Sequence, residues 1–408
     1  MSRVLILVEN LPVPLDRRVW QEAGALRDAG YDVTVICPRM RGWVQPEEVR
    51  EGIRIYRYWI PGEAGSLGGF FAEYAAALVG SLWCSLKARR DGDFEVIHLC
   101  NPPDILFLVA LPWRLLTGSR VIFDVHDLWP EMFAAKFSRR NPIYWLTRLA
   151  ERATLALADA VIATNESVRE VVMRRGRKRE EEVLVVRTAP NRMDLDAPED
   201  LELKKGRRYL VGYIGVMGDA DGVEFLIRAA HHLTKELGRE DVQFLLMGTG
   251  PDFSRLQALR DELGLADYVD MPGRVTDAFL FRALRTIDLG VGCDPINEYN
   301  HHCTMNKTLE YMAFGKAQVL FDLKEGRFSA GDAALYVKEN DAAQLAEGMV
   351  ELLDDEPRRR EMGRIGQRRL AEQLGWERSV AALKTAYQRA RRSAVEAGAV
   401  EGETANSF

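Results

Sequence analysis

The sequence predicts an α/β protein with two doubly wound parallel-sheet domains of the Rossmann type. Short aliphatic runs such as residues 4–8 lack polar alternation, which is typical of strands buried on both faces of a parallel sheet. Each run is followed by a longer segment with helical periodicity, as in βαβ units. The pattern restarts at residue 209, after a charged and turn-rich stretch. We therefore expect an N-terminal domain at 1–190, a linker at 191–208 and a second domain at 209–375.

The expected strands follow this pattern along both halves. In the first half they are 4–8, 33–37, 96–99, 121–125, 160–163 and 183–187. In the second half they are 209–214, 242–247, 269–271, 288–291 and 318–321. After the last strand we expect only helices, with a long one at 376–394. A disordered tail is expected at 395–408, where aliphatic periodicity ends.

Length and composition favour an ordinary cytoplasmic protein. The 408 residues are 47% hydrophobic and 28% charged, and the formal net charge of −6 gives no sign of nucleic-acid binding. Residues 1–192 carry 27 Lys and Arg against 24 Asp and Glu, and the remainder carries 28 against 37. The slightly basic first half suits contact with an anionic surface. Five cysteines without a C-x-x-C pair, and an N-terminus that enters a strand at once, predict reduced thiols, no zinc site and no signal peptide.

The stretch 294–322 combines a polar loop, a helix and a short buried strand. Thr304 is the expected N-cap, and Gly315 is expected to end the helix. Asn306 and Glu310, and Lys307 with the same Glu310, have the spacing of neighbours on a helix surface. A helix N-terminus with a lysine suits an anion, and a carboxylate one turn further suits paired sugar hydroxyls. The alternative is a capped surface helix with a solvated Lys–Glu pair.

Two glycine-rich loops precede this stretch, each directly after an expected strand. They contain Gly215 and Gly218, and Gly248 and Gly250. A strand, a glycine loop and a helix bring backbone N–H groups against a phosphate, although such loops also serve simply to turn the chain. The first turn of the chain has no G-x-G-x-x-G, which disfavours a nicotinamide or flavin enzyme. All the notable loops follow strands, so we expect them to line a ligand cleft at the carboxyl ends of both sheets: 9–18, 100–104, 126–131, 215–222, 248–252, 272–275 and 294–307.

Three further segments have both a functional and an ordinary interpretation. Residues 70–86 contain a single charge and are followed by Lys87, Arg89 and Arg90; this segment is either a core helix or an interfacial helix lying on lipid. The basic cluster 174–179 is either a solvated loop or a lipid-headgroup contact. The D-x-D of residues 194–196 lies in the linker, where a turn is favoured over a metal site.

An ordered set of motifs points to one family: NLPVPLDRRVWQEAGALRDAGYDVTVICP, NPPD, HDLWPE, YIGVMGDADGVEFLIRAA, GTGPDFSRL, PGRV and TMNKTLEYMAFGK. Together they resemble the retaining family 4 glycosyltransferases (glycosyl transferases group 1), in a divergent branch with the last of these motifs. The resemblance runs along nearly the whole chain. It implies the GT-B fold, with two Rossmann-like domains facing a central cleft and the helix 376–394 returning to the N-terminal domain.

The resemblance implies a donor site in the second half. Glu310 matches the glutamate that holds the nucleotide ribose hydroxyls, and Arg274 and Val275 match a turn whose backbone faces the base. Lys307 lies where an ammonium could neutralise the leaving diphosphate. The other expected donor-binding residues are Asn306, Thr304 and the four glycines Gly215, Gly218, Gly248 and Gly250.

The resemblance also implies catalytic and acceptor residues in the first half. His126 matches a histidine that contacts the donor sugar. Asp127 is either an acceptor base or the cap of the next helix. The expected acceptor or phosphate loops contain Arg17, Arg18, Asn101 and Asp104.

Members of this family transfer a sugar from a nucleoside diphosphate and usually need no metal. We expect no cofactor and no metal here, with a UDP- or GDP-linked sugar as co-substrate. Front-face attack, in which the leaving phosphate takes the acceptor proton, would make positioning and electrostatics the main work of the protein. The expected acceptor is a glycan, a lipid-linked or a small-molecule hydroxyl, in cell-envelope, exopolysaccharide or secondary-metabolite synthesis. A peripheral contact of the N-terminal domain with the inner face of the membrane is also expected.

Three departures from the family pattern keep alternatives open. Val216 and Asp221 stand where an Arg and a Lys are usual, His302 stands in place of a Glu, and Ala317 in place of a Pro. The first departure removes positive charge from the place where a diphosphate needs it. An inactive accessory or nucleotide-binding protein is therefore one alternative, and a GT-B sugar-nucleotide epimerase is another.

Overall fold

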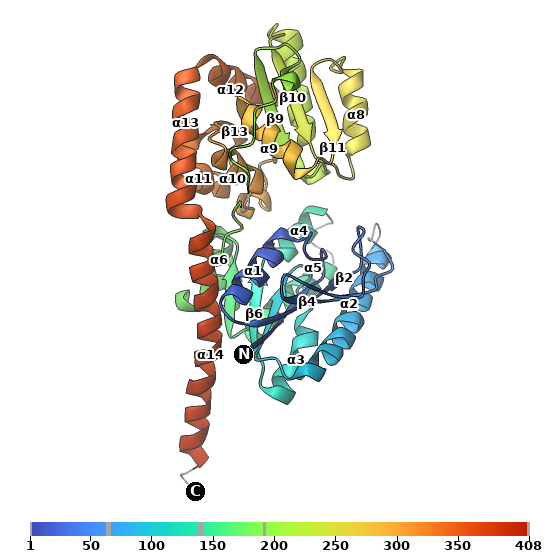
Figure 1. Cartoon of the computed structure of the whole chain (residues 1–408), viewed down its shortest axis with the longest axis vertical. Coiled ribbons are helices and arrows are strands. Elements are labelled where there is room, and N and C mark those ends of the chain that lie inside the picture. The colour runs from blue at the N-terminus through green and yellow to red at the C-terminus, as the bar shows by residue number, and fades with distance from the viewer. Residues whose placement is uncertain (1, 63–66, 137–141, 191–192, 406–408) are drawn as a thin grey trace. The chain divides into compact units, whose positions relative to one another are not determined.

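The chain divides into two units, Met1–Thr188 with Glu377–Phe408, and Ala189–Trp376 (Figure 1). The computed structural model describes residues 2–62, 67–136, 142–190 and 193–405. Both units are Rossmann-like α/β folds with a parallel sheet, as the sequence predicts.

The first unit contains an eight-stranded sheet with the order β3-β4-β2-β1-β5-β6-β7-β8. Its neighbouring strands are parallel, except that β3 and β4 form an antiparallel hairpin at one edge. The strands are β1 (Arg3–Val8), β2 (Asp32–Pro38), β3 (Glu47–Arg50), β4 (Ile53–Tyr58), β5 (Val96–Cys100), β6 (Arg120–Val125), β7 (Ala160–Ala163) and β8 (Val183–Val185).

The hairpin of β3 and β4 is absent from the strands expected from the sequence. Its second strand, Ile-Arg-Ile-Tyr-Arg-Tyr, has isoleucines and tyrosines alternating with arginines rather than a continuous aliphatic run. This strand pairs with β2 near one end of the sheet. Arg57 of β4 is nevertheless buried, because its guanidinium donates to the carbonyl oxygens of Val13 and Gln45 and pairs with Glu48.

Helices cover both faces of the first sheet. They are α1 (Arg17–Asp28), α2 (Leu67–Ala88), α3 (Phe107–Thr117), α4 (Trp129–Lys136), α5 (Pro142–Leu157), α6 (Glu166–Gly176) and α14 (Trp376–Ala405). Ile97 and Leu99 of β5 pack in one apolar cluster with Trp113 of α3. His98 of the same strand points to the other face, where its Nδ1 lies 2.8 Å from the hydroxyl of Tyr387 in α14. The period of two along β5 thus separates an apolar face from a face with polar contacts.

Helix α14 packs on the first unit although it is the last element of the chain. The Ser379 hydroxyl accepts from the Arg187 N–H at 3.0 Å and donates to its carbonyl oxygen at 2.9 Å. Tyr387 is fully buried and its ring lies 5.4 Å from that of Tyr31. The helix extends to Ala405, and the disorder expected for 395–408 stays a prediction, with residues 406–408 outside the described part. Ala and Glu dominate this extension, and both favour helix without any need for aliphatic periodicity.

Helix α2 is the one long apolar helix in the described residues. The segment Gly68–Asp91 is long and apolar enough to cross a membrane, with a mean hydropathy of 1.3, and 22% of its apolar window is buried. Core helices can meet the same criterion of length and composition. Here the buried side is a narrow stripe that includes Ala77, Cys84 and Ala88.

The second unit contains a six-stranded parallel sheet with the order β11-β10-β9-β12-β13-β14. The strands are β9 (Tyr209–Ile214), β10 (Val242–Met247), β11 (Val269–Gly273), β12 (Leu289–Gly292), β13 (Gln318–Phe321) and β14 (Ala334–Val337). The helices are α7 (Val223–His231), α8 (Phe253–Glu262), α9 (Asp277–Thr286), α10 (Asn306–Ala313), α11 (Lys324–Ala330), α12 (Ala342–Asp354) and α13 (Glu356–Arg369). Strand β14 corrects the expectation of helices alone after residue 321; it has only four residues and half-buried Leu335 and Tyr336 at its centre, which gives little strand signal.

We expect Tyr387→Ala to destabilise the first unit by about 3–5 kcal/mol, because a fully buried aromatic ring and its contact with His98 are lost. Chemical denaturation followed by tryptophan fluorescence would measure the change. Lys384→Ala is the matched control, since Lys384 is exposed on the same helix and alanine favours helix. Equal stability of the two variants would show that α14 contributes little to the unit.

Candidate active site

The loops that follow β9 and β10 form one hydrogen-bonded layer at the carboxyl edge of the second sheet. The Gly215 N–H donates to the carbonyl oxygen of Met247 at 3.1 Å. The Met217 N–H donates to the Thr249 carbonyl at 3.2 Å, and the Asp252 N–H donates to the Met217 carbonyl at 3.0 Å. The sequence predicted two separate glycine loops, and the structure brings them together.

The glycines in this layer are required by close backbone approach. A Cβ on Gly248, whose φ is +141°, would lie 1.8 Å from the carbonyl oxygen of Gly215. A Cβ on Gly250 would lie 2.5 Å from the Met217 carbonyl oxygen. At Gly218 the nearest atom to such a Cβ would be a carboxylate oxygen of Asp221 at 3.2 Å, which leaves more room. Gly215 and Val216 are exposed at the top of this layer, so a ligand can reach their backbone.

Helix α10 begins at Asn306, two residues after the expected cap. Met305 occupies the N-cap position without a capping side chain, while the Thr304 hydroxyl lies 3.3 Å from a carboxylate oxygen of Glu325. The expectation that Thr304 caps the helix is therefore wrong, because its hydroxyl contacts another helix. Asn306 is exposed and Glu310, one turn later, is half-buried. The helix ends at Ala313 with Phe314 as its C-cap, and Gly315, with φ +65°, follows and stops it as predicted.

The turn after β11 carries the other expected donor residues. Arg274 is exposed, and Val275 is half-buried against the apolar cluster that contains Leu284. Thr276 then caps α9 by accepting from the Phe279 N–H at 3.3 Å. The Gly248 N–H donates to the Gly273 carbonyl at 2.9 Å, which joins this turn to the glycine layer.

Lys307 lies beneath the glycine layer and is bonded to a carboxylate. Its Nζ is 2.7 and 2.9 Å from the two carboxylate oxygens of Asp294, and the lysine is only 8% exposed. Its Cε would be 3.3 Å from a Cβ on Gly215, and its Nζ lies 4.9 Å from the ring centroid of Tyr213. Burial lowers the pKa of Lys307, but Asp294 and the neighbouring Cys293 outweigh burial and raise the pKa above its ordinary value. Lys307 is therefore a charged lysine whose ammonium is already neutralised.

Asp221, which stands where the family has a lysine, holds the first glycine loop. One of its carboxylate oxygens accepts from the Gly218 N–H at 3.0 Å. Burial raises the pKa of Asp221, opposed by Lys307 and reinforced by Asp294. The departure from the family pattern thus replaces a cation by a carboxyl that bonds to the loop itself.

In the first unit, Asn101 organises the loop that carries the expected catalytic residues. Its side-chain oxygen accepts from the N–H groups of His126 at 2.7 Å and Asp127 at 3.3 Å. Its amide nitrogen donates to Asp104 at 2.7 Å and to the Asp127 carbonyl at 2.8 Å. Asn101 and Asp104 are 2% and 1% exposed, and their place in an acceptor or phosphate loop stays a prediction. The loop needs buried partners for its backbone, and these two residues supply them.

Asp124 connects His126 to Arg18. His126 Nε2 lies 2.6 Å from one carboxylate oxygen of Asp124, and the Arg18 guanidinium donates to both oxygens at 3.0 and 2.6 Å. Burial alone would raise the pKa of Asp124, but Arg18 and His126 outweigh it and hold the pKa well below its ordinary range. Asp124 is therefore ionised and fixes the ring of His126.

Arg17 and Arg18 were expected in the first loop, in contact with phosphate or acceptor. Both instead begin α1, after the capping residue Asp16. Arg18 is 6% exposed and also donates to the Val186 carbonyl, so its guanidinium is bonded within the protein; a role toward phosphate or acceptor stays a prediction. Arg17 is exposed on the first turn of the helix.

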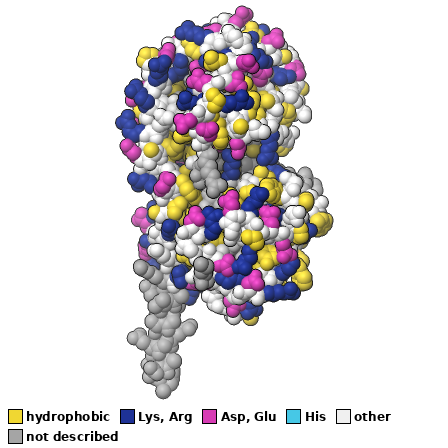
Figure 2. Space-filling model, in the orientation of Figure 1, with side chains coloured by type: hydrophobic (Ala, Val, Ile, Leu, Met, Phe, Trp, Pro, Cys, Tyr) yellow, Lys and Arg dark blue, Asp and Glu magenta, His cyan; other side chains and the backbone are white. Residues whose placement is uncertain are grey.

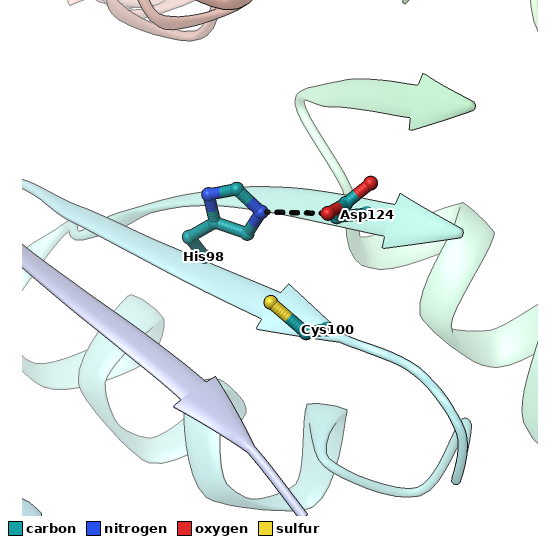
Figure 3. Close-up of side chains that lie close together, drawn as sticks. All are labelled: His98, Cys100 and Asp124. Atoms are coloured by element: carbon teal, nitrogen blue, oxygen red, sulfur yellow. Dashed lines mark ion pairs between the residues drawn. The ribbon is translucent and has the colours of Figure 1, made fainter. Parts of the chain in front are cut away.

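Within the described ranges, one group of side chains has the spacing of metal ligands. His98, Cys100 and Asp124 lie together on β5 and β6, with their ligand atoms within 4.8 Å of one another (Figure 3). Burial raises the pKa of Cys100 well above its ordinary value, so it is a thiol rather than a thiolate. Both oxygens of Asp124 already accept from Arg18. These donors do not fit a metal ion, and we assign no metal to them.

Glu9 is a buried carboxyl that sequence reasoning missed. It follows β1 directly and is 6% exposed, and one of its oxygens is buried without a hydrogen-bond partner in the described residues. Burial, with a smaller contribution from Glu73, raises its pKa from 4.5 to about 8. A polar residue immediately after an aliphatic run was the available signal. Asp124 was missed because it lies inside such a run.

We expect Gly248→Ala to remove nucleotide binding and to lower the stability of the second unit, because the new Cβ cannot fit beside the Gly215 carbonyl. Gly264→Ala is the matched control, since Gly264 also has positive φ, +66°, but has no atom within 4 Å of its Cβ position. The control should cost about 1 kcal/mol from backbone strain alone. Nucleotide titration and denaturation of both variants would measure the difference, and equal effects would contradict the close approach.

We expect Glu9→Gln to change how stability depends on pH. The pKa of Glu9 is about 8 in the folded state and 4.5 in the unfolded state. Between pH 4.5 and pH 8 the folded protein therefore keeps this proton and the unfolded chain does not. The wild type should therefore lose stability relative to the variant as pH rises from 5 to 8, by about 1 kcal/mol per pH unit. Denaturant unfolding at pH 5, 6.5 and 8 would measure this difference; a constant difference would show that Glu9 is ionised in the folded protein.

Comparison with protein families assigns both units. The glycosyl transferase 4-like domain matches residues 15–188, and the glycosyl transferases group 1 domain matches residues 208–355. Together these matches cover most of the chain and both sheets.

Individual relatives agree with the family matches. The α-D-kanosaminyltransferase of Streptomyces kanamyceticus is 26% identical over 58% of this chain, a match that spans 64% of that protein and so less than two thirds of it. The phosphatidyl-myo-inositol mannosyltransferase of Mycolicibacterium smegmatis is 24% identical, over 85% of this chain and 83% of that protein.

Solved structures show the fold at lower identity. Sucrose-phosphate synthase of Thermosynechococcus elongatus has a TM-score of 0.77 and 18% identity, over 96% of this chain and all of that one. An Anabaena protein solved with UDP-glucose has a TM-score of 0.65 and 13% identity, over 97% of this chain and all of that one. With two Rossmann-like units and matching domains in both, this chain belongs to the group 1 glycosyltransferases of GT-B fold.

Proposed function

We propose that this glycosyltransferase is a retaining enzyme that takes a sugar from a nucleoside diphosphate, UDP or GDP, to an acceptor hydroxyl. The observation that carries the proposal is the position of α10. Its N-terminus, with exposed Asn306 and half-buried Glu310, follows a strand at the same sheet edge as the exposed glycine layer. A helix end and loop amides suit phosphate, and a carboxylate one turn away suits ribose hydroxyls. The UDP-glucose bound to the Anabaena relative supports this class of donor.

The diphosphate would be held mainly by backbone groups. The sequence suggested that the Lys307 ammonium could neutralise the diphosphate. In the structure this ammonium already forms an ion pair with Asp294. Because the N–H groups of Gly215, Met217 and Gly218 bond within the protein, we assign the leaving charge to the Val216 N–H and the N-terminal end of α10, with Lys307 supporting the loop from below. Fixed dipoles in a site that excludes water can stabilise developing charge at little reorganisation cost.

The chemical step proposed is a front-face exchange. The bond between the anomeric carbon and the phosphate oxygen breaks, and the acceptor oxygen bonds to that carbon on the same face. The acceptor proton passes to the leaving phosphate, so protons and charges balance without a protein nucleophile, cofactor or metal. His126 would contact the donor sugar, with Asp124 and Arg18 fixing its ring; Asp127 remains a candidate acceptor base.

The acceptor proposed is a glycan, a lipid-linked sugar or a small molecule, in cell-envelope, exopolysaccharide or secondary-metabolite synthesis. The phosphatidyl-myo-inositol mannosyltransferase, whose name contains a lipid, supports a lipid-linked acceptor. We propose a cytoplasmic location; the five cysteines, none in a disulfide, are consistent with it.

We expect one nucleotide series to raise the thermal midpoint of the protein and Glu310→Ala to abolish the rise. A ligand at a hundred times its Kd stabilises the folded state by about 2.7 kcal/mol. A thermal-shift screen of uridine, guanosine and adenosine diphosphates and their sugars would measure this. Glu347→Ala, an exposed glutamate on α12, is the matched control and should keep the full shift.

Turnover then separates the remaining alternatives. Transfer with the anomeric configuration kept, followed by NMR of the product, supports the proposal. Nucleotide binding without transfer or donor hydrolysis would indicate an accessory protein, and a product epimerised on the nucleotide would indicate an epimerase. An unchanged shift in Glu310→Ala would contradict the role of α10.

A further inference from the structure

Three neighbouring helices of the first unit expose most of the large apolar side chains in the described residues. Eleven of the nineteen exposed large hydrophobic residues lie on α2, α3 and α5. The most exposed include Val79 and Trp83 of α2, Leu115 and Leu116 of α3, and Trp145 and Leu149 of α5, each between 64% and 75% exposed. Helix α3 contacts both α2 and α5, so these side chains belong to adjoining surfaces, called here the three-helix face.

The three helices are fixed to the sheet by their inner sides. Ala77, Cys84 and Ala88 of α2 are buried in the same apolar cluster as Val109 and Trp113 of α3. A Cβ on Gly80 would come within 2.5 Å of Tyr58 Cβ, so α2 lies directly on β4. The Trp113 indole N–H donates to the Ser85 hydroxyl at 3.1 Å. Helix α2 therefore cannot cross a bilayer without breaking the core. Its exposed apolar side needs a partner that binds while the helix stays packed on the sheet.

The charges on the three helices are mostly positive. Helix α3 carries Arg114 and no acidic residue, and α2 carries Lys87 with Glu73 as its one acidic residue. Arg114 pairs with Asp159 and Lys87 pairs with Glu47, so neither is a free positive charge. On α5, Arg152 is exposed, whereas Glu151 is 5% exposed and pairs inward with Arg175.

The loop that follows α2 has two arginines, Arg89 and Arg90, and two aspartates, Asp91 and Asp93. Asp91 and Asp93 of this loop are taken up by ion pairs with Arg54 and Arg89. Arg90 is exposed beside them. Figure 2 shows Lys and Arg among apolar side chains on the side of this unit where α2 runs.

Exposed apolar side chains together with basic side chains indicate what binds to the three-helix face. Tryptophan and leucine side chains insert at the headgroup boundary of a bilayer, and Lys and Arg beside them attract anionic lipid. A second copy of the chain would bring the same positive charges against this face, which disfavours a symmetric dimer. We propose that the three-helix face docks on an anionic lipid surface, with α2, α3 and α5 lying along the interface rather than across it.

Co-sedimentation of the full-length protein with vesicles tests the proposal. Vesicles of equal phosphatidylglycerol and phosphatidylcholine should bind the protein, and vesicles of phosphatidylcholine alone should bind it less. The triple variant Trp83→Ser, Leu116→Ser and Trp145→Ser should lose at least about tenfold in affinity, because one anchor is removed from each helix. Arg90→Glu with Arg152→Glu should weaken binding to the anionic vesicles only.

A matched control removes exposed apolar side chains from the other unit. The triple variant Leu201→Ser, Leu237→Ser and Phe328→Ser should bind vesicles as the wild type does, since these residues lie outside the three-helix face. Circular dichroism and the nucleotide-induced thermal shift should be unchanged in both triple variants, so lost vesicle binding would not reflect misfolding or a failure of the donor site. Equal vesicle binding by the two triple variants, or no binding by the wild type, would overturn the proposal. A dimer seen by sedimentation equilibrium and lost only in the first variant would assign the face to a second copy instead.

Discussion

The loops that follow parallel strands lie at one edge of the sheet. The candidate site residues of the first unit and those of the second unit both depend on this constraint. In the second unit the loops after β9, β10 and β11 meet at that edge and hydrogen-bond to one another through Met217, Met247 and Gly273. In the first unit the ends of β5 and β6 meet through the side chain of Asn101. Residues far apart in the sequence thus converge without any long-range motif, because βαβ connection fixes the direction of every strand.

Buried ion pairs lie directly beneath both edges. Lys307 and Asp294 support the glycine layer, and Arg18 and Asp124 support His126. A buried charge is costly unless it is paired and hydrogen-bonded, so each pair holds its partners in one geometry. The family resemblance implied that Lys307 could neutralise a diphosphate and that Arg18 lies where phosphate or acceptor binds, and both roles stay predictions. In the structure both residues form ion pairs that fix the shape of the loops.

The sequence predicted the fold well where signals were strong. Continuous aliphatic runs marked the buried strands, and the order of loops marked the sheet edges. It missed β3, β4 and β14, because Ile53–Tyr58 carries two arginines and Ala334–Val337 is short. Asp124 could not be recognised, since its importance comes from burial and from a partner 106 positions away, whereas Glu9 stands directly after an aliphatic run and could have been noticed. Burial of Arg18 could not be inferred for the same reason: residue type and position along the chain do not show which side of a helix faces the sheet.

The electrostatics of the donor loop follow from these pairs. With Lys307 neutralised by Asp294, and Asp221 bonded to the Gly218 N–H, the side chains around the glycine layer provide no net positive charge. Burial raises the pKa of Asp221, while Lys307 and the Gly218 N–H act in the opposite direction. In the proposed function the Val216 N–H and the N-terminal end of α10 remain to face the diphosphate, and the field of such groups falls off more steeply with distance than that of a cation. Such a site would hold a diphosphate only at close range, and we propose that the glycines that let the backbone approach it take the place of the missing arginine and lysine.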